Sequence, residues 1–254
     1  MARHIVVTGA SSGIGASIAT LLSTHSLADH LTLVGRSTTR LTATSSAVSS
    51  SSPTPPTTTL LATDLSSPDP YAAGDALLAS LPSSPPVTAI VHAAAISRDA
   101  LLASSPPSLL RQTLETNTGI ALSLARSLSR SALRDRSDPP TRRDLVLIGS
   151  VVGGSLGSPG QVPYSASKAA LRGIVSSLAL EMAPKNLRVN MIEPGFIDTP
   201  MTQGLSEKRK AQVEADVPLG GMGSPDDVAE AVVFLLKSNY ATGSIITLDG
   251  GLSL

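Results

Sequence analysis

Short runs of β-branched and aliphatic residues alternate along the chain with longer segments in which apolar residues recur every three or four positions. The short runs indicate buried strands, and the longer spacing indicates helices that cover a sheet. The expected strands are 5–8, 30–34, 60–63, 87–91, 145–148, 188–192 and 244–248, and the expected helices include 14–22, 71–81, 108–128, 164–183 and 228–236. This alternation predicts a single α/β domain over residues 1–254, built on a Rossmann-type doubly wound parallel sheet of about seven strands.

Three segments depart from this pattern. Residues 42–59, TATSSAVSSSSPTPPTTT, hold so little apolar surface that we expect a flexible insertion between the second helix and the third strand. Residues 127–144 carry five arginines and three aspartates, and we expect a basic loop insertion there. This loop is either a solvated surface or a docking surface for an acidic partner, whose contacts salt would screen. Residues 202–216 are polar with loose helical spacing, which suits a mobile substrate lid.

The composition argues against several classes of function. Equal numbers of acidic and basic residues give a formal net charge of zero, so nothing in the charge favours nucleic acid or an anionic membrane. The chain has no cysteine, and its four histidines show no metal-ligand spacing, so we expect no metal. No apolar run reaches the roughly 18 residues that span a bilayer. Since residues 1–4 lead straight into the first strand, we expect no targeting presequence, and a cytoplasmic or mitochondrial matrix protein.

The clearest candidate chemistry lies in residues 149–168, GSVVGGSLGSPGQVPYSASK. Ser150 follows an apolar strand, and Pro163 suits the first turn of a helix that Tyr164 opens. Residues four apart on a helix share a face, so Lys168 can sit beside the Tyr164 hydroxyl, where an ammonium favours the phenolate. With Ser150 holding a carbonyl oxygen, these three groups can protonate a ketone as a hydride reaches its carbon.

A second candidate is the glycine-rich turn TGASSGIG at residues 8–15. It links a strand to a helix, as in dinucleotide-binding folds, where glycines allow close approach to a diphosphate that faces the helix N-terminus. A purely structural turn is the alternative. The expected cofactor contacts here are Gly9, Ser11, Ser12, Gly13, Ile14 and Gly15.

Further cofactor contacts are expected where later strands end. Arg36 and Ser37 follow the second strand, and an arginine at this place suits the 2′-phosphate of NADP, unless it is a solvated surface residue. Asp64 and Leu65 follow the third strand, where Asp64 either receives the adenine or caps the next helix. The small residues Ala93 and Ala94 let the cofactor ribose lie against the backbone.

A Pro-Gly turn after the sixth strand is placed to cover the nicotinamide. The expected contacts are Pro194, Gly195, Ile197 and Thr199, the last two at the carboxamide. Asn117 falls inside a helix, where an amide is intrinsically unfavourable. A mid-helix asparagine is either exposed or has a specific partner, and we expect the second.

With these residues in view, the chain resembles the short-chain dehydrogenase/reductase family over essentially its whole length. The resemblance is carried by TGASSGIG, Asn117, Ser150, YSASK, PGFIDT and ITLDGG. It implies a catalytic tetrad of Asn117, Ser150, Tyr164 and Lys168. In that tetrad Lys168 also holds the nicotinamide ribose, and the backbone carbonyl of Asn117 positions a water of the proton relay.

Within the family, the segments AAISRDALL, GSVVG, PYSASKAAL, EMAPKNLRVN and VPLGGMGSPDDVA are most similar to 3-oxoacyl-[acyl-carrier-protein] reductases, including the fungal mitochondrial kind. The resemblance implies NADPH-dependent reduction of 3-oxoacyl thioesters in fatty acid biosynthesis, with acyl carrier protein as a partner and a homotetramer as the assembly. Two alternatives remain, namely the same chemistry on a free small ketone, secondary alcohol or specialised metabolite, and a cofactor-binding module without turnover.

Two positions depart from the family pattern. The usual Asn-Asn-Ala-Gly after the fourth strand is replaced by residues 92–95, His-Ala-Ala-Ala. Backbone contacts with a cofactor survive this change, but the side-chain contacts of the asparagine do not. Ser12 stands where NADP-preferring members often carry a basic residue, which weighs against NADP, while Arg36 weighs for it.

Overall fold

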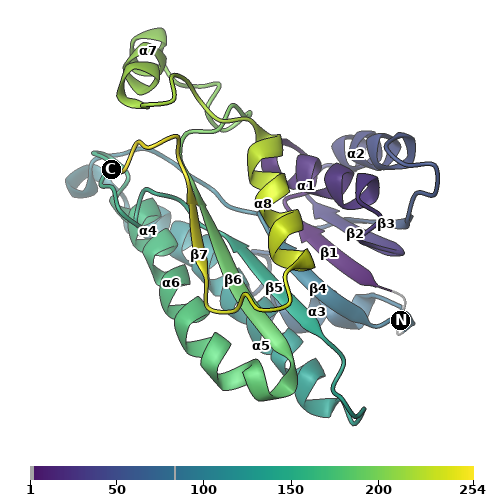
Figure 1. The fold of residues 1–254 in the computed structure, drawn as a ribbon. Helices are drawn as coiled ribbons and strands as arrows, with labels where there is room; N and C mark the ends of the chain where they lie inside the picture. The colour runs from purple at the N-terminus through teal and green to yellow at the C-terminus, as the bar shows by residue number, and fades with distance from the viewer. Residues whose placement is uncertain (1–2, 83) are drawn as a thin grey trace.

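Seven strands form one parallel sheet in the computed structural model, which describes residues 3–82 and 84–254. Their order across the sheet is β3-β2-β1-β4-β5-β6-β7 (Figure 1). The strands are β1 (His4–Thr8), β2 (His30–Gly35), β3 (Thr57–Ala62), β4 (Val87–His92), β5 (Arg143–Ile148), β6 (Leu187–Pro194) and β7 (Ile245–Leu248). Strands β1, β5 and β6 are buried along their whole length, as expected for parallel strands covered on both faces. The predicted α/β Rossmann-type sheet is confirmed.

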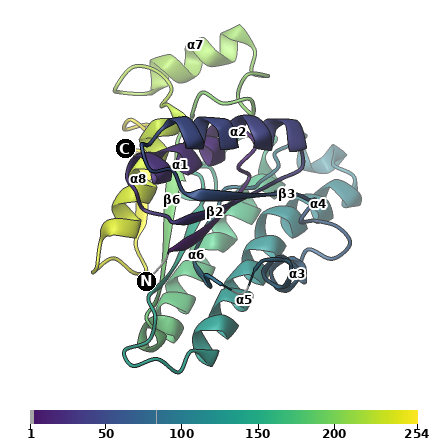
Figure 2. The ribbon, with the colours of Figure 1, turned by 90° about the vertical axis from the view of Figure 1, so that its right-hand side faces the viewer.

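Helices cover both faces of the sheet. One hydrophobic cluster packs α1 and α8 against the sheet, and the other packs α5 and α6 against the opposite face (Figures 1 and 2). The helices are α1 (Gly13–Thr24), α2 (Thr38–Ser50), α3 (Ala73–Ser80), α4 (Pro107–Leu114), α5 (Ile120–Arg134), α6 (Val162–Met182), α7 (Glu207–Asp216) and α8 (Pro225–Lys237), with short helical turns at Leu102–Ser104, Glu115–Gly119 and Ala183–Lys185. Over residues 3–82 and 84–254, no helix is long and apolar enough to cross a membrane.

The strand order reverses between β1 and β4, which are paired in parallel with Thr8 opposite His92. In open α/β sheets a crevice forms beyond the carboxyl ends of the strands at such a point. The loops after β1 and β4, residues 9–12 and 93–101, therefore border the same crevice. This placement is what brings the glycine-rich turn close to Ala93 and Ala94.

The expected flexible insertion at residues 42–59 is wrong for most of its length. Helix α2 continues to Ser50, and β3 begins at Thr57, so the connection between them is short. Leu41, Thr44 and Val48 are buried at helical spacing, a pattern that the surrounding serines and threonines conceal. The hydroxyls of exposed Ser46 and Ser49 donate to carbonyls four residues earlier, which leaves the helix intact.

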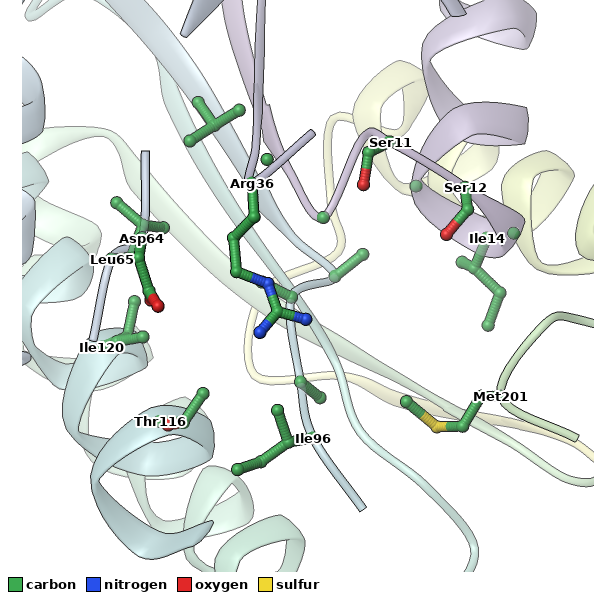
Figure 3. Close-up of a pocket in the computed structure, with 18 of the residues that line it drawn as sticks. Ser11, Ser12, Ile14, Arg36, Asp64, Leu65, Ile96, Thr116, Ile120 and Met201 are labelled. Atoms are coloured by element: carbon green, nitrogen blue, oxygen red, sulfur yellow. The ribbon is translucent and has the colours of Figure 1, made fainter. Parts of the chain in front are cut away.

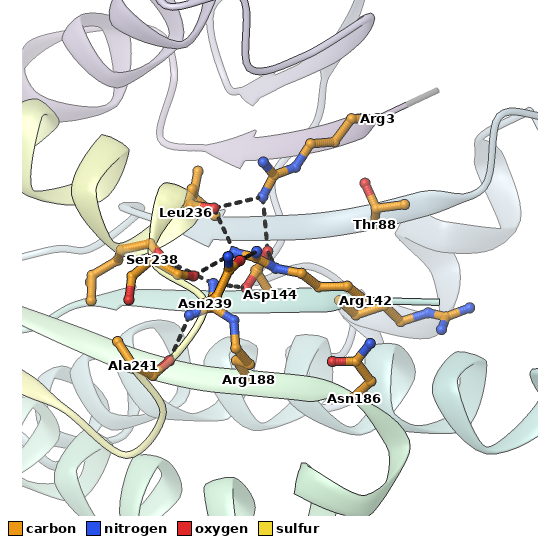
Figure 4. A network of polar contacts seen from close by, with 12 residues as sticks. Arg3, Thr88, Arg142, Asp144, Asn186, Arg188, Leu236, Ser238, Asn239 and Ala241 are labelled. Atoms are coloured by element: carbon orange, nitrogen blue, oxygen red, sulfur yellow. Dashed lines mark hydrogen bonds and ion pairs between the residues drawn. The ribbon is translucent and has the colours of Figure 1, made fainter. Parts of the chain in front are cut away.

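The expected loop insertion at residues 127–144 is also mostly regular structure. Helix α5 runs to Arg134 and β5 begins at Arg143, so only residues 135–142 form the connection. Arg143 is buried and pairs with Asp135 at 2.8 Å. Arg142 belongs with Arg3 and Arg188 to a cluster around buried Asp144, and the arginines also donate to carbonyls at the end of α8 (Figure 4). These arginines therefore join strands and a helix end, which does not support the docking surface.

Helix α7 stands beyond the carboxyl ends of the strands, apart from the two helical layers (Figures 1 and 2). It lies within residues 202–216, the expected lid, and only Val213 of its residues is buried. The Arg209 guanidinium lies 5.6 Å from the centre of the Phe196 ring, which connects the helix to the turn after β6.

Candidate active site

The glycine-rich turn lies tightly against the ends of neighbouring segments. A Cβ on Gly9 would come within 2.7–2.9 Å of the backbone of Ala93 and Ala94, and Gly9 has a φ of +71° that favours glycine. A Cβ on Gly15 would lie 2.3 Å from the Gly9 carbonyl oxygen. Gly13 faces Thr199, whose side chain would be 3.1 Å from an added Cβ. Larger residues would thus clash with these neighbours, so this close packing of the turn requires glycine.

The N-terminus of α1 is open to an anion. Ser12 occupies the N-cap position without a side-chain cap hydrogen bond, and the first turn contains no acidic residue. Free N–H groups and the helix dipole favour negative charge at such an end. Together with the glycines that exclude a Cβ, this end fits the diphosphate of a dinucleotide.

A cavity of about 250 Å³ extends from this turn toward β2 and β3. Figure 3 shows Arg36 reaching into it between Asp64 and the serines of the turn. The expected cofactor residues that line it are Gly9, Ser11, Ser12, Gly13, Ile14, Gly15, Arg36, Asp64, Leu65, Ala93, Ala94 and Thr199. Arg40, on the first turn of α2, also lines it, and the sequence analysis missed this residue. Two arginines in the wall of the cavity suit a phosphate monoester.

Two residues near this cavity have structural contacts as well. Asp64 accepts hydrogen bonds from the N–H and hydroxyl of Ser66, which, with the charge of Arg36, hold the pKa of its carboxyl below the usual value. No helix begins there, since α3 starts at Ala73, so the expected alternative of a helix cap is wrong. Ser37 caps α2 through Arg40 N–H and is not among the lining residues.

A second cavity, of about 380 Å³, holds Ser150, Tyr164 and Lys168 together. Ile14, Ala93, Ala95, Thr199 and Met201 line both cavities, so the two are continuous. Pro194, Gly195 and Ile197 form another wall of this second cavity. The structure thus brings the Ser/Tyr/Lys set and the Pro-Gly turn to one place, as the sequence analysis expected.

The Tyr164 phenol sits in a strongly desolvated position. Burial raises its pKa, an interaction with the Ser150 hydroxyl opposes this, and the negative charge of Asp99 raises it further. Lys168 is 4% exposed, and its ammonium donates to the carbonyl oxygen of Ile148 at 2.7 Å and lies 5.7 Å from the centre of the Tyr164 ring. Burial lowers the Lys168 pKa to about 8.

The direction of the Tyr164 pKa differs from the expectation that Lys168 would favour the phenolate. Desolvation of the phenol outweighs its interaction with Ser150, and the Lys168 ammonium is directed at the backbone of β5. At neutral pH the phenol therefore keeps its proton, as a group that donates a proton requires.

Asn117 is buried and lies outside both cavities. Its amide accepts from the N–H of Ile96 at 2.8 Å and donates to the carbonyl of Ile96 and the hydroxyl of Ser167, at 2.9 and 3.0 Å. It lies in a π-helical turn, Glu115–Gly119, between α4 and α5. The prediction that this asparagine has specific partners is confirmed, and these partners are Ile96 and Ser167. Asn117 joins the loop after β4 to helix α6, next to Lys168.

His92, where the family pattern has asparagine, is fully buried. Its Nδ1 shares a hydrogen bond of 2.7 Å with the Thr8 hydroxyl, and its Nε2 has no partner among the described residues. Burial, and to a lesser degree the charge of Lys168, lowers its pKa to about 3. The imidazole is therefore neutral at physiological pH.

Other polar residues near the site give no signal in the sequence. Asp99 and Gln161 line the second cavity and are hydrogen-bonded to each other at 2.9 Å. Glu193, 1% exposed, forms a two-point ion pair with Arg172 of α6 at 2.7 and 2.5 Å. These pairs join residues far apart along the chain, so local spacing could not reveal them.

A family model described as "Enoyl-(Acyl carrier protein) reductase" matches residues 9–253. The chain belongs to the short-chain dehydrogenase/reductase family. Carbonyl reductase family member 4 of Danio rerio is 44% identical over 165 residues, which are 65% of each chain. A 3-oxoacyl-[acyl-carrier-protein] reductase of Chlamydia muridarum is 38% identical over 169 residues, 66% of each chain. The matched part is thus just under two thirds of these relatives.

The fold is also similar to that of solved proteins. The crystal structure of a 3-oxoacyl-(acyl-carrier-protein) reductase from Agrobacterium tumefaciens, with NADP bound, superposes with a TM-score of 0.85 at 28% identity. The superposition covers 98% of this chain and 93% of the other.

Proposed function

We propose that this protein is an NADPH-dependent oxidoreductase that reduces 3-oxoacyl thioesters, carried by acyl carrier protein, to 3-hydroxyacyl thioesters. The main support is that Ser150, Tyr164 and Lys168 line a cavity continuous with the one that fits a dinucleotide. A protein that only binds the cofactor does not require a protonated phenol and a serine hydroxyl in the cavity beside it, so this arrangement favours an enzyme.

NADP is the cofactor in this proposal. The turn after β1 would hold the diphosphate on backbone N–H groups, and Arg36 and Arg40, which line the same cavity, would hold the 2′-phosphate by charge-assisted hydrogen bonds. Ala93 and Ala94, which line the cavities, would offer backbone to a ribose, and Lys168 would hold the nicotinamide ribose. Pro194, Gly195, Ile197 and Thr199 would cover the nicotinamide. NADP bound to the similar reductase of Agrobacterium tumefaciens supports this choice.

The chain's own groups handle the proton. Bound NADPH supplies a hydride to the carbonyl carbon. The Ser150 hydroxyl donates to the carbonyl oxygen, and the Tyr164 phenol transfers its proton to that oxygen as negative charge develops there. Lys168 stabilises the resulting phenolate, and the backbone carbonyl of Asn117 positions a water through which the proton is restored. Ketone, NADPH and one proton thus give alcohol and NADP⁺.

The substrate assignment rests on the names of relatives and on the cavity. Two of the similar proteins are named 3-oxoacyl-[acyl-carrier-protein] reductases. The cavity walls near Tyr164 are mostly apolar, with Val151, Val152 and Phe196 among them. The similarity to a protein named carbonyl reductase favours, as a second candidate, the same reaction on a free small ketone, secondary alcohol or specialised metabolite.

Assembly into a homotetramer completes the proposal. Exposed leucines on α5 and α6 support it, with Leu122 45%, Leu133 50% and Leu180 82% exposed, since large exposed apolar side chains favour association. Light scattering on the purified protein would measure the mass directly.

A substrate panel tests the function. The rate of NADPH oxidation is measured with a 3-oxoacyl thioester on acyl carrier protein, the same acyl group on N-acetylcysteamine, and neutral ketones. Faster turnover of the thioesters would support the proposal. Turnover of ketones alone would favour the second candidate, and cofactor binding without reduction of any compound would contradict both.

A further inference from the structure

The second cavity carries a negative charge on one wall, contributed by Asp99. We propose that Asp99 makes this site favour carbonyl compounds in which the neighbouring acid group is masked, as a thioester or ester, over free 3-oxo acids. This inference rests on the proposed reduction of 3-oxoacyl compounds and assigns the charge class of the substrate. Asp99 acts here as a specificity-determining residue.

The position of Asp99 is fixed by contacts with the segment that leads into helix α6. Its Oδ1 accepts from Nε2 of Gln161 at 2.9 Å and from the Ser97 hydroxyl at 3.3 Å. The backbone N–H of Ala100 donates to the carbonyl of Gly160 at 2.9 Å. Gln161 precedes Tyr164 by three residues, so these contacts hold the carboxylate on the side of the cavity where Tyr164 acts.

The other walls give a substrate carboxylate no compensating cation. Among the described residues that line the cavity, the charged side chains are Asp99 and Lys168. The Lys168 ammonium is buried and already donates to the Ile148 carbonyl. In a 3-oxo acid the carboxylate lies two bonds from the ketone carbon, so it must enter together with the reacting group. A thioester or ester at that position brings no charge.

The expected selectivity is modest because Asp99 is exposed to solvent. We take the carboxylate of a bound 3-oxo acid to lie roughly 6–8 Å from that of Asp99, with an effective dielectric constant between those of a protein surface and water. The repulsion then lowers the affinity for the acid about 5- to 10-fold. Salt screens such a repulsion, with a Debye length of about 10 Å at 0.1 M. The selectivity should therefore weaken as ionic strength rises.

The test compares methyl 3-oxobutanoate with 3-oxobutanoate, which differ in charge and by one methyl group. We would measure kcat/KM for both with NADPH in the wild-type protein and in Asp99→Asn, which keeps an oxygen acceptor for Gln161. The variant should raise kcat/KM for the acid about 5- to 10-fold relative to the ester. Added salt should raise the acid-to-ester ratio in the wild type and leave it unchanged in the variant.

Asp138→Asn is the matched control, because Asp138 is exposed in the loop before β5, at the amino end of that strand. It should leave the acid-to-ester ratio at the wild-type value. Ester reduction with an acid-to-ester ratio unchanged by Asp99→Asn would overturn this inference alone. No reduction of the ester or of an N-acetylcysteamine thioester by the wild type would overturn the proposed function and, with it, the inference.

Discussion

Tyr164 keeps its proton at neutral pH because its surroundings disfavour the phenolate. Burial raises the pKa of this phenol, and the interaction with Ser150 only partly opposes the effect. A proton that is held until a carbonyl oxygen gains negative charge suits reduction, in which the oxygen is protonated as the hydride arrives. In the reverse direction, alcohol oxidation, the phenolate would be needed, and higher pH would favour it.

Replacing Tyr164 by phenylalanine removes the acid and keeps the ring. We expect kcat for carbonyl reduction to fall at least about 100-fold, the usual contribution of a positioned general acid. The dissociation constant of NADPH, measured by fluorescence titration, should change by only a few-fold. Tyr240→Phe is the matched control, since Tyr240 is 100% exposed, and its activity should equal that of the wild type. Wild-type turnover in Tyr164→Phe would contradict the mechanism.

Arg36 sets the charge of the cavity end that would receive a 2′-phosphate. Arg36→Asp should lower kcat/KM for NADPH and shift the NADPH-to-NADH preference by about 10- to 100-fold, because it replaces a charge-assisted hydrogen bond by repulsion. Arg40→Ala should shift it less, since only a cation is lost. Arg136→Asp, in the exposed loop before β5, should leave the preference unchanged. An unchanged preference in Arg36→Asp would show that this guanidinium does not contact the cofactor.

The sequence revealed those site residues whose neighbours in the chain explain them. Tyr164 and Lys168 are four apart on one helix, and the glycines of residues 8–15 are adjacent, so local geometry was enough to group them. Asp99 and Glu193 could not be found in this way. Asp99 is held by Gln161, 62 residues away, and Glu193 is held by Arg172, 21 residues away. Only the folded chain brings these pairs together.

Among the elements, helix α6 and strand β6 are joined by an ion pair beneath the segment that carries Ser150. Glu193 of β6 is buried, and its side chain lies close to Gly149 and Gly154. A Cβ added at Gly149 would be 3.2 Å from Cγ of Glu193, and one added at Gly154 would be 2.7 Å from its carboxylate. Arg172 lies one turn beyond Lys168 on α6 and donates to both carboxylate oxygens. The pair therefore connects the elements that carry Ser150, Lys168 and the Pro-Gly turn.

Removing Arg172 would leave the carboxylate of Glu193 buried without its cation. We expect Arg172→Ala to lower the free energy of unfolding by about 3 kcal/mol, at the low end for a broken buried pair because the arginine is partly exposed. Urea unfolding measures this value. Arg126→Ala is the control, since it breaks an exposed pair with Asp75, and it should cost at most about 1 kcal/mol. An equal decrease in the free energy of unfolding of the two variants would show that the burial of Glu193 does not increase the cost of losing its partner.

The apolar pattern correctly predicted the order and type of the elements. The two wrong predictions, the insertions at residues 42–59 and 127–144, arose where serines, threonines and arginines obscured that pattern. In α2 the buried positions 41, 44 and 48 are spread among serines and threonines, so composition suggested disorder. In residues 127–144 the arginines suggested solvent, although Arg143 is buried by pairing with Asp135. Local patterns cannot show that a charge is paired across the fold, because its partner is chosen by tertiary contacts.

At the scale of the whole molecule, the sheet places a buried histidine in each of the two strands beside its switch point and a half-buried histidine in the next strand, β2. His4 and His92 are buried, and His30 lies against His4 with ring centres 4.4 Å apart. Burial lowers the pKa of all three imidazoles, most strongly that of His92. The fold therefore holds them neutral under conditions in which the unfolded chain takes up protons.

This difference predicts a loss of stability in mild acid. Below the unfolded pKa of about 6.5, each neutral buried histidine lowers the free energy of unfolding by up to about 1.4 kcal/mol per pH unit, until its pKa in the fold is reached. For His92 that window extends from about pH 6.5 to about 3. Between pH 7 and 5, the His92→Asn variant should lose ~2 kcal/mol less than the wild type in urea unfolding. Most carboxylates titrate below this range, and His4 and His30 are common to both proteins, so the difference isolates His92. Parallel curves would mean that its imidazole takes up a proton in the fold at the same pH as in the unfolded chain.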